Sequence, residues 1–176
     1  MKKDDLKTQR RKAREWALQL LFQLDFTPGR EGVDAALESF WSQQWHTQAH
    51  DIRDQTGATP LPPETPAEAA DAVAPAKIRA FVEHLVRGVL ANRENIDAQM
   101  APFLRNWTIN RMSVVDRNVL RLAFFEIWFS DKKAPPVAVL NEAIDLAKYF
   151  SNSESGRFIN GVLDRALKDA PKPPAN

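Results

Sequence analysis

The segment that decides the fold is TQRRKAREWALQLLFQLD, residues 8–25. Its apolar side chains recur at intervals of three and four residues, the spacing that lines one face of an α-helix. These residues are Ala13, Trp16, Ala17, Leu20, Leu21 and Leu24. We predict a helix that docks this face on a core, with Thr8 as its N-cap residue.

Four cationic side chains lie near the start of this predicted helix: Arg10, Arg11, Lys12 and Arg14. The dipole of a helix favours anions at its N-terminus, so helix stability alone does not account for cations there. One interpretation is a solvated basic face that has no partner. The other is a surface that binds a polyanion, for which nucleic acid is the obvious candidate.

Positive charge is concentrated at this end of the chain. Residues 1–14 carry seven lysine and arginine side chains against two aspartates, whereas the whole chain carries 24 basic and 23 acidic side chains. The remainder of the chain is therefore net acidic. Such an asymmetry is typical of a basic segment that meets an acidic partner.

The composition indicates one globular domain of 176 residues, of which 44% are hydrophobic and 27% are charged. Because the chain has no cysteine, it has no disulfide, no thiolate nucleophile and no cysteine-bound metal. The charged N-terminus lacks the apolar region of a secretory signal. The most apolar run, residues 119–129, contains Arg121 and Glu126 and is too short to span a membrane. We expect a cytoplasmic protein with no membrane partner.

Helical spacing of apolar residues continues through the other segments that we expect to be ordered. These segments cover residues 33–45, 77–92, 95–106, 114–129, 137–150 and 157–167. Ser113 has the place of an N-cap residue, and Gly88 and Gly161 are expected to allow close helix packing. Since no strand signal appears, we predict an all-α fold, a compact bundle of about seven helices.

A proline- and alanine-rich stretch of about residues 47–76 interrupts the helical pattern. It contains Pro60, Pro62, Pro63, Pro66 and Pro75. We predict a long loop or insertion with one short helical turn near residues 67–72.

Two histidines, His46 and His50, stand four residues apart at the edge of this stretch. Two metal ligands on one helical face can have this spacing. The sequence places no third ligand beside them, so we interpret them as solvated and expect no metal site. His84, the third histidine, lies alone in a predicted helix.

No motif for catalysis is present in the sequence. There is no glycine-rich phosphate loop, no Gly-x-Ser-x-Gly elbow and no pair of acids in a pocket-forming position. The conspicuous acids are spaced as helix surface, caps or ion-pair partners; they are Glu15, Asp116, Glu126, Glu142, Asp145 and Asp164. We expect a binding protein rather than an enzyme, with no catalytic residue and no cofactor.

Three separated blocks of sequence resemble the NusB family of bacterial transcription antitermination factors. The first is RRKAREWALQLLFQLD at residues 10–25, and the second is RMSVVDRNVLRLA at residues 111–123, followed by Glu126. The third joins VAVLNEAIDLAKYF at residues 137–150 to FINGVLD at residues 158–164. In this order the blocks cover essentially all the sequence that we expect to be ordered.

The resemblance implies a single NusB-like helical domain made of two small subdomains, at about residues 10–95 and 96–170. A basic N-terminal arm at residues 1–9 would precede it, and a tail at residues 171–176 would follow. The stretch at 47–76 would be an insertion longer than the family pattern.

The resemblance also implies a function and partners. A member of this family would be a non-enzymatic RNA-binding factor that recognises the boxA element of ribosomal RNA transcripts. It would do so together with NusE, a ribosomal small-subunit protein, and would join the elongating RNA polymerase with other Nus factors. A homodimer formed through an exposed helix face is left open.

Six residues match positions that contact RNA in the family. Arg10, Arg11, Lys12 and Arg14 match its arginine-rich RNA-binding motif, with phosphate contact as the implied role. Glu154, where the family commonly has aspartate, and Phe158 match positions beside the RNA. Phe158 is either an aromatic platform on which a base stacks or the edge of the apolar face of its helix.

A second class of function is a helical protein-interaction module of the kind attached to ribosomal RNA cytosine methyltransferases. Such a module has no RNA specificity of its own. The chain has no cysteine and no catalytic domain after the helical one, so we expect the antitermination factor.

Overall fold

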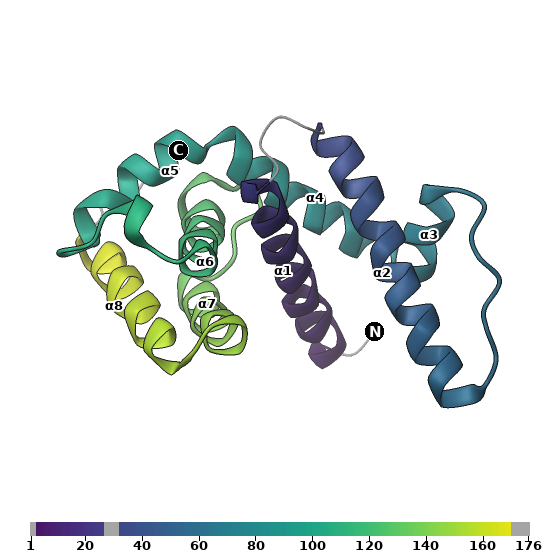
Figure 1. The fold of residues 1–176 in the computed structure, drawn as a ribbon. Helices are drawn as coiled ribbons and strands as arrows, with labels where there is room; N and C mark the ends of the chain where they lie inside the picture. Colours follow the sequence, from purple (N-terminus) through teal and green to yellow (C-terminus); the bar gives the residue numbers. More distant parts are fainter. Residues whose placement is uncertain (1–2, 27–31, 170–176) are drawn as a thin grey trace.

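The computed structural model describes residues 3–26 and 32–169, and every regular element in these ranges is helical (Figure 1). The eight α-helices are α1 (Lys3–Phe26), α2 (Val33–Thr56), α3 (Pro66–Val73), α4 (Ala76–Ala91), α5 (Arg93–Met100), α6 (Val114–Phe124), α7 (Pro136–Phe150) and α8 (Ser153–Asp169). Two short 3₁₀ turns are η1 (Ala101–Phe103) and η2 (Ile109–Arg111), and η3 (Phe125–Phe129) is a π-helical turn. The predicted all-α class is confirmed.

Helix α1 lies in the middle of the molecule, between α2 on one side and α6 and α7 on the other (Figure 1). Its predicted apolar face is confirmed: five of its six residues are buried, and Leu24 packs partly buried against the core. The prediction that Thr8 is the N-cap residue is wrong, because α1 already begins at Lys3. Residues 3–9 favour this extension, since they contain no glycine or proline to stop a helix.

The residues assigned to the N-terminal arm are therefore helical from residue 3 onward. The predicted tail, residues 171–176, lies outside the described part of the chain. The division into two subdomains stays a prediction; the buried apolar residues of both proposed halves form one cluster.

Helix α2 continues to Thr56, so the prediction of a loop from residue 47 is wrong over its first ten positions. No proline or glycine occurs between residue 47 and Gly57, where the chain adopts a positive φ of 72° that ends the helix. The short predicted helix near residues 67–72 is confirmed as α3. Thr65 caps α3 by accepting a hydrogen bond from the backbone N–H of Glu68 at 3.2 Å.

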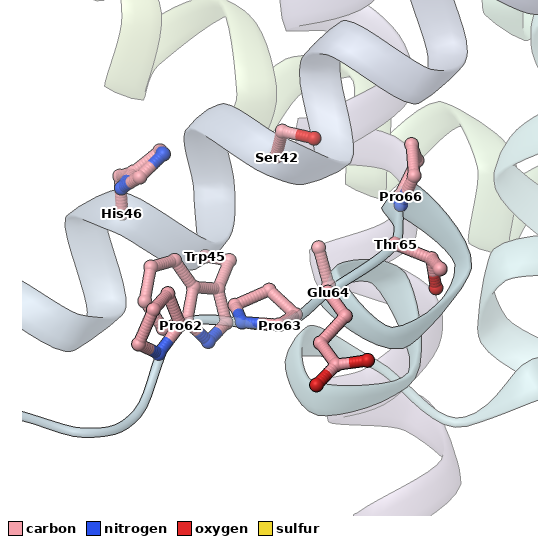
Figure 2. Close-up of a pocket in the computed structure, with 9 residues that line it drawn as sticks. Ser42, Trp45, His46, Pro62, Pro63, Glu64, Thr65 and Pro66 are labelled. Carbon is pink, nitrogen blue, oxygen red and sulfur yellow. The ribbon is translucent and has the colours of Figure 1, made fainter.

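The proline-rich connection folds back along α2 (Figure 2). Pro62 and Pro63 lie beside the Trp45 ring, and together with α3 they close a shallow cavity of about 200 Å³ against α2. His46 and His50 are exposed, and His50 lies 3.3 Å from the carboxylate of Asp54. Among the described residues, no group of three or more histidine, aspartate or glutamate side chains is placed to hold a metal ion. None of the helices in those ranges is long and apolar enough to cross a membrane.

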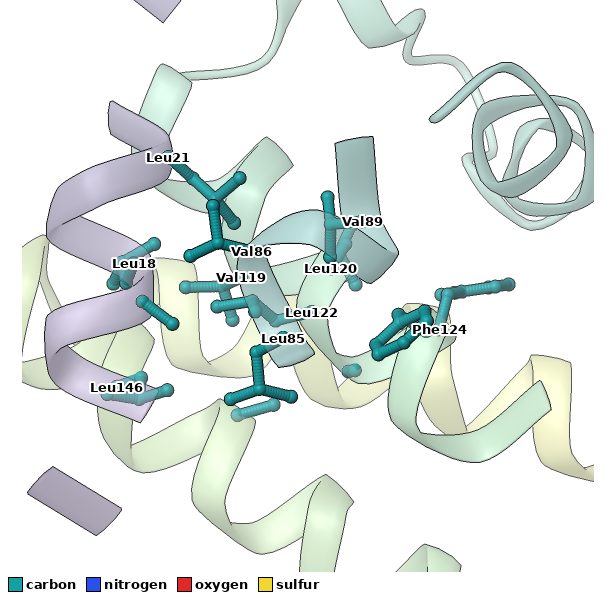
Figure 3. Packing of buried hydrophobic residues seen from close by; sticks show 14 of the residues in the cluster. Leu18, Leu21, Leu85, Val86, Val89, Val119, Leu120, Leu122, Phe124 and Leu146 are labelled. Carbon is teal, nitrogen blue, oxygen red and sulfur yellow. The ribbon is translucent and has the colours of Figure 1, made fainter. Parts of the chain in front are cut away.

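The core gathers around α6, which packs apolar side chains against α1, α4 and α7 (Figure 3) and also carries buried Asn118 and Arg121. Leu18 from α1, Leu85 from α4, Leu120 from α6 and Leu146 from α7 all belong to this single cluster. The predicted N-cap is confirmed, since Ser113 Oγ accepts a hydrogen bond from the backbone N–H of Asp116 at 3.0 Å. Contacts with α6 therefore position the helices that pack around it.

Close packing at Gly88 is confirmed, whereas close packing at Gly161 is not. A methyl group on Gly88 would overlap the ring of Phe125, the first residue of η3. A methyl group on Gly161 would meet nothing closer than the Arg165 guanidinium at 3.9 Å. The glycine in α4 therefore lets the helices approach, and the glycine in α8 does not.

Ion pairs and hydrogen bonds join α1 to α6 and to its continuation η3 at two points. Near the middle of α1, the guanidinium of Arg14 donates two hydrogen bonds of 2.7 Å to the carboxylate of Glu126 in η3. At its end, Asp25 accepts hydrogen bonds from Arg93 at 3.1 Å, Arg117 at 3.1 Å and Asn118 at 3.0 Å. Because the two helices run antiparallel, these contacts fix both their distance and their register.

The environment of Asp25 favours the charged form of its carboxyl group. Burial alone would raise its pKa, but hydrogen bonds from Arg117 and Asn118 and the charges of Arg117 and Arg93 hold the pKa below its usual value. This carboxylate therefore contributes to stability as long as it stays ionised.

We expect Gly88→Ala to destabilise the fold by about 1–3 kcal/mol, because the added methyl group must displace the buried Phe125 ring. Gly161→Ala is the matched control, for which we expect a gain of up to about 1 kcal/mol from helix propensity. Urea unfolding followed by circular dichroism measures both. Equal effects of the two substitutions would contradict the close approach at Gly88.

Stability is also expected to depend on pH through Asp25. Since its pKa is lower in the folded state than the unfolded value of about 4, its contribution is complete above that pH and is lost as the pH falls through the folded-state pKa. Asp25→Asn should lower stability at neutral pH and flatten the acid side of the profile. Asp54→Asn, an exposed carboxylate, should leave the profile unchanged. Urea unfolding at a series of pH values tests this, and an unaltered acid slope in Asp25→Asn would contradict it.

Candidate nucleic-acid interface

The four predicted cations of α1 do not share one environment. The side chains of Arg11 and Lys12 are 42% and 51% exposed, and Arg10 is exposed as well. Only 8% of the Arg14 side chain is exposed. The helix thus turns three cations outward and one inward.

Arg10 and Arg14 lie one turn apart on α1 and share a neighbour on α4. The guanidinium of each lies 5.7 Å from the centre of the Phe81 ring, within the range of a cation–π contact. Arg10 has no ion pair among the described residues. The ring therefore orients the Arg10 guanidinium without neutralising it.

Arg14 is held by Glu126, of which only 3% is exposed. Burial alone would lower the pKa of Arg14, but the hydrogen bonds and charge of Glu126, with the charge of Glu142, raise it above its ordinary value. A phosphate could reach this guanidinium only if the buried pair opened. The predicted contact of Arg14 with RNA stays a prediction, and this geometry disfavours it.

Arg11 and Lys12 have exchangeable acidic partners. Arg11 Nη1 lies 3.3 Å from Asp145 of α7, and Arg11 Nε lies 3.7 Å from Glu15. Lys12 Nζ lies 3.2 Å from Glu15 and 5.5 Å from the centre of the Trp16 ring. Half-exposed pairs of this kind contribute about 1 kcal/mol or less, so a polyanion can compete for both cations.

Glu154 and Phe158 line a second feature, an open groove of about 380 Å³ at the N-terminal end of α8. The groove is lined by Trp107, Arg111, Met112, Ser113, Asp116, Asn152, Glu154, Ser155 and Phe158. Glu154 is exposed in the first turn of α8, and Phe158 is half-buried. The Phe158 ring packs partly buried against the core and also lines the groove, so the stacking of a base on this ring stays a prediction.

Aromatic surface and positive charge meet in this groove. The rings of Trp107 and Phe158 have their centres 6.1 Å apart and are inclined by 59°. The guanidinium of Arg111 lies 5.8 Å from the Trp107 ring, half of whose residue surface is exposed. Unpaired bases can stack on aromatic rings and arginine planes of this kind, and the carboxylates of Asp116 and Glu154 also line the groove.

Polar groups complete the wall of the groove. Ser155 Oγ donates a hydrogen bond to Asp116 Oδ2 at 3.2 Å, and the Ser155 N–H donates to Asn152 Oδ1 at 2.9 Å. Asp116 Oδ1 is buried and has no hydrogen-bond partner within the described part of the chain.

Sequence reasoning did not find Trp107, Arg111 or Asp116 as site residues. The sequence predicts helical spacing through residues 95–106, but α5 ends at Met100 and Asn106, just before Trp107, adopts a positive φ of 60°. Asparagine before tryptophan, shortly after Pro102, is the local signal that the ring leaves the helical face. The cap prediction concerned only the start of α6, where the Asp116 N–H donates to Ser113. Only the fold shows that Asp116 also lines the groove.

Helix α7 links the two features. Asp145 pairs with Arg11, and Tyr149, one turn further along α7, is 74% exposed. The chain then passes through Asn152, a groove residue, into α8. None of the α1 cations lines the α8 groove itself. The structure therefore brings Glu154 and Phe158 together in the groove. Arg10, Arg11 and Lys12 lie outside the groove, with Arg11 beside Asp145 of α7.

Comparison with known proteins identifies the family. The model of the NusB family matches residues 11–168. Transcription antitermination protein NusB from Anaeromyxobacter dehalogenans is 36% identical over 164 residues, which are 93% of this chain and 94% of that protein. The protein of the same name from Desulfitobacterium hafniense is 36% identical over 163 residues, covering 93% of this chain and 90% of that protein.

Solved structures show the same fold. NusB from T. maritima has a TM-score of 0.65 and 30% sequence identity, covering 92% of this chain and 93% of that one. A chain from a crystal structure of NusB and NusE in complex with double-stranded RNA has a TM-score of 0.60 at 22% identity, covering 92% of this chain and 97% of that one. The chain belongs to the NusB family of transcription antitermination proteins, which are not enzymes.

Proposed function

We propose that this chain binds boxA RNA of ribosomal RNA transcripts together with NusE and joins the elongating RNA polymerase complex with other Nus factors. The observation that carries the proposal is the groove in which Trp107, Phe158 and Arg111 meet. Such a groove suits unstacked bases of a single strand, in a chain whose family acts in antitermination.

Phosphate contact is assigned to the outward cations of α1. Arg10, Arg11 and Lys12 are exposed or half-exposed and either lack an acidic partner or share weak surface pairs. Neutralising backbone phosphates would release counterions from the RNA, which supplies much of the affinity. Arg14 holds α1 in place from within, so that its three neighbours point outward.

Base contact is assigned to the α8 groove. Phe158 and Trp107 offer stacking surfaces, and Glu154 stands at the rim, where its carboxylate can accept hydrogen bonds from exocyclic amino groups. A chain of similar fold was solved in a complex with NusE and double-stranded RNA, which supports NusE as a partner and RNA as the class of ligand.

One observation favours a second candidate function, a protein-interaction module without RNA specificity. Phe22 and Phe26, 39% and 64% exposed, form an aromatic pair at the end of α1 with ring centres 4.9 Å apart. Exposed aromatic rings of this kind are enriched at protein interfaces. The two candidates differ in whether the chain alone prefers boxA RNA to a scrambled sequence.

We expect Arg10→Gln/Arg11→Gln to weaken boxA binding and to leave the unfolding transition close to that of the wild type. The slope of log affinity against log salt should become shallower by about 0.7 for each lost single-strand phosphate contact. Arg53→Gln/Lys168→Gln, which removes two exposed cations on α2 and α8 outside the proposed RNA surface, is the control. Fluorescence anisotropy at several salt concentrations measures the slopes, and a slope equal to that of the control would contradict the assignment.

Substitution in the groove should instead reduce the preference for boxA. We expect Trp107→Ala to cost about 1–3 kcal/mol of boxA affinity through the loss of one stacking surface, with the salt slope unchanged. Phe26→Ala removes an exposed ring at the end of α1 that carries no RNA in this proposal. If Phe26→Ala lowered boxA affinity as much as Trp107→Ala, the groove would not be the base-binding site.

A further inference from the structure

A second pocket lies beside α1, apart from the α8 groove. It has a volume of about 120 Å³ and is built by three segments that are distant in sequence. Its lining residues are Arg10 of α1, Phe81 of α4, Glu126 of η3, and Lys132, Lys133 and Ala134 of the connection from η3 to α7.

The uncompensated charge of this pocket is positive. Both oxygens of Glu126 are engaged by Arg14, so the single acid of the lining is already neutralised. Arg10, Lys132 and Lys133 form no ion pair within residues 3–26 and 32–169. Asp131, the nearest acid along the connection, lies instead 3.6 Å from His84 Nε2. Three cations therefore surround a small space without an anion to balance them.

The surroundings position the Arg10 guanidinium and the backbone at Lys132. The Phe81 ring supports the Arg10 guanidinium at 5.7 Å. Ser130 Oγ accepts a hydrogen bond from the backbone N–H of Lys132 at 3.0 Å and is hydrogen-bonded to His84 Nε2 at 2.9 Å. Burial and the positive charge of Lys132 lower the pKa of His84, whereas the charges of Asp131 and Glu126 raise it, with a net lowering.

The shape and chemistry of the pocket suit a phosphate group rather than a base. One guanidinium and two ammonium groups supply charge-assisted hydrogen bonds to phosphate oxygens. The only aromatic ring of its lining, Phe81, already has the guanidinium groups of Arg10 and Arg14 beside it, so it has little surface left for stacking. The small volume also favours one compact anion.

We propose that Arg10, Lys132 and Lys133 form a pocket for one backbone phosphodiester of the single-stranded RNA whose bases occupy the α8 groove. This inference rests on the proposed function and extends it. Arg10 faces α4 and η3, whereas Arg11 faces Asp145 of α7. The strand therefore crosses the N-terminal half of α1, and the connection from η3 to α7 is part of the RNA surface.

A phosphate pocket has a signature that a base-binding site lacks. Phosphate contacts position a strand without reading its sequence. Loss of the pocket must therefore weaken boxA and scrambled RNA by the same factor and reduce the salt dependence of both. It must leave the ratio of the two affinities unchanged.

The test compares Lys132→Gln/Lys133→Gln with the control Arg53→Gln/Lys168→Gln, which lowers the net charge by the same amount at exposed positions on α2 and α8. Both lysines of the pocket are exposed, so the unfolding midpoint should stay at the wild-type value. We expect the pocket variant to lose about three- to tenfold in affinity at moderate salt and about 0.7 in salt slope. Affinity and slope equal to those of the control would overturn the pocket, as would a loss confined to boxA.

Lysine acylation followed by mass spectrometry provides a second, direct readout on the wild-type protein. BoxA RNA should protect Lys132 and Lys133 and leave the exposed Lys168 reactive, whereas inorganic phosphate at the same phosphate concentration should protect none of them. Equal protection by inorganic phosphate would assign the pocket to a free anion and overturn the proposal. Wild-type protein that does not prefer boxA would overturn the proposed function and this inference together, whereas normal preference without protection would overturn the pocket alone.

Discussion

The buried ion pair between Arg14 and Glu126 is the constraint on which the rest of the structure depends. It joins the middle of α1 to η3, the turn that continues the central helix α6, through two hydrogen bonds of 2.7 Å. Removing one partner of such a pair leaves a buried charge and costs about 3–5 kcal/mol, although replacing both by apolar side chains is often neutral. The pair therefore contributes position more than net stability. It lies on the buried side of α1, whereas Arg10, Arg11 and Lys12 lie on more exposed sides of the same helix.

Function follows from this orientation. With Arg14 turned inward, Arg10 rests on Phe81 beside the two lysines of the connection to α7, and Arg11 reaches Asp145. Positive charge is thus spread over both flanks of α1 rather than gathered on one face. Aromatic surface lies separately, at the start of α8. In our proposal the strand is held by its phosphates at one end of α7 and read by its bases at the other, which matches the general division between positioning and specificity.

The sequence predicted the fold well wherever local chemistry decides the structure. The apolar face of α1, the Ser113 cap and the close approach at Gly88 follow from spacing, side-chain chemistry and the size of glycine. The predicted loop began too early. The prolines of this segment all follow Gly57, and Gly57 is the first residue that stops α2. Neither the burial of Arg14 nor the gathering of Lys132 and Lys133 around Arg10 was predictable, since both depend on contacts between residues more than 100 positions apart.

In our proposal the outward cations of α1 meet the RNA, whereas the buried Arg14 does not touch it. Arg14→Met/Glu126→Met tests this division, because the double substitution removes the buried pair without stranding a charge and keeps apolar side chains in its place. Urea unfolding and boxA binding over a salt series are measured on the same protein. We predict a folded protein with wild-type affinity and wild-type salt slope. A folded double variant whose slope is shallower by about 0.7 would show that Arg14 itself contacts a phosphate, the opposite of what we propose.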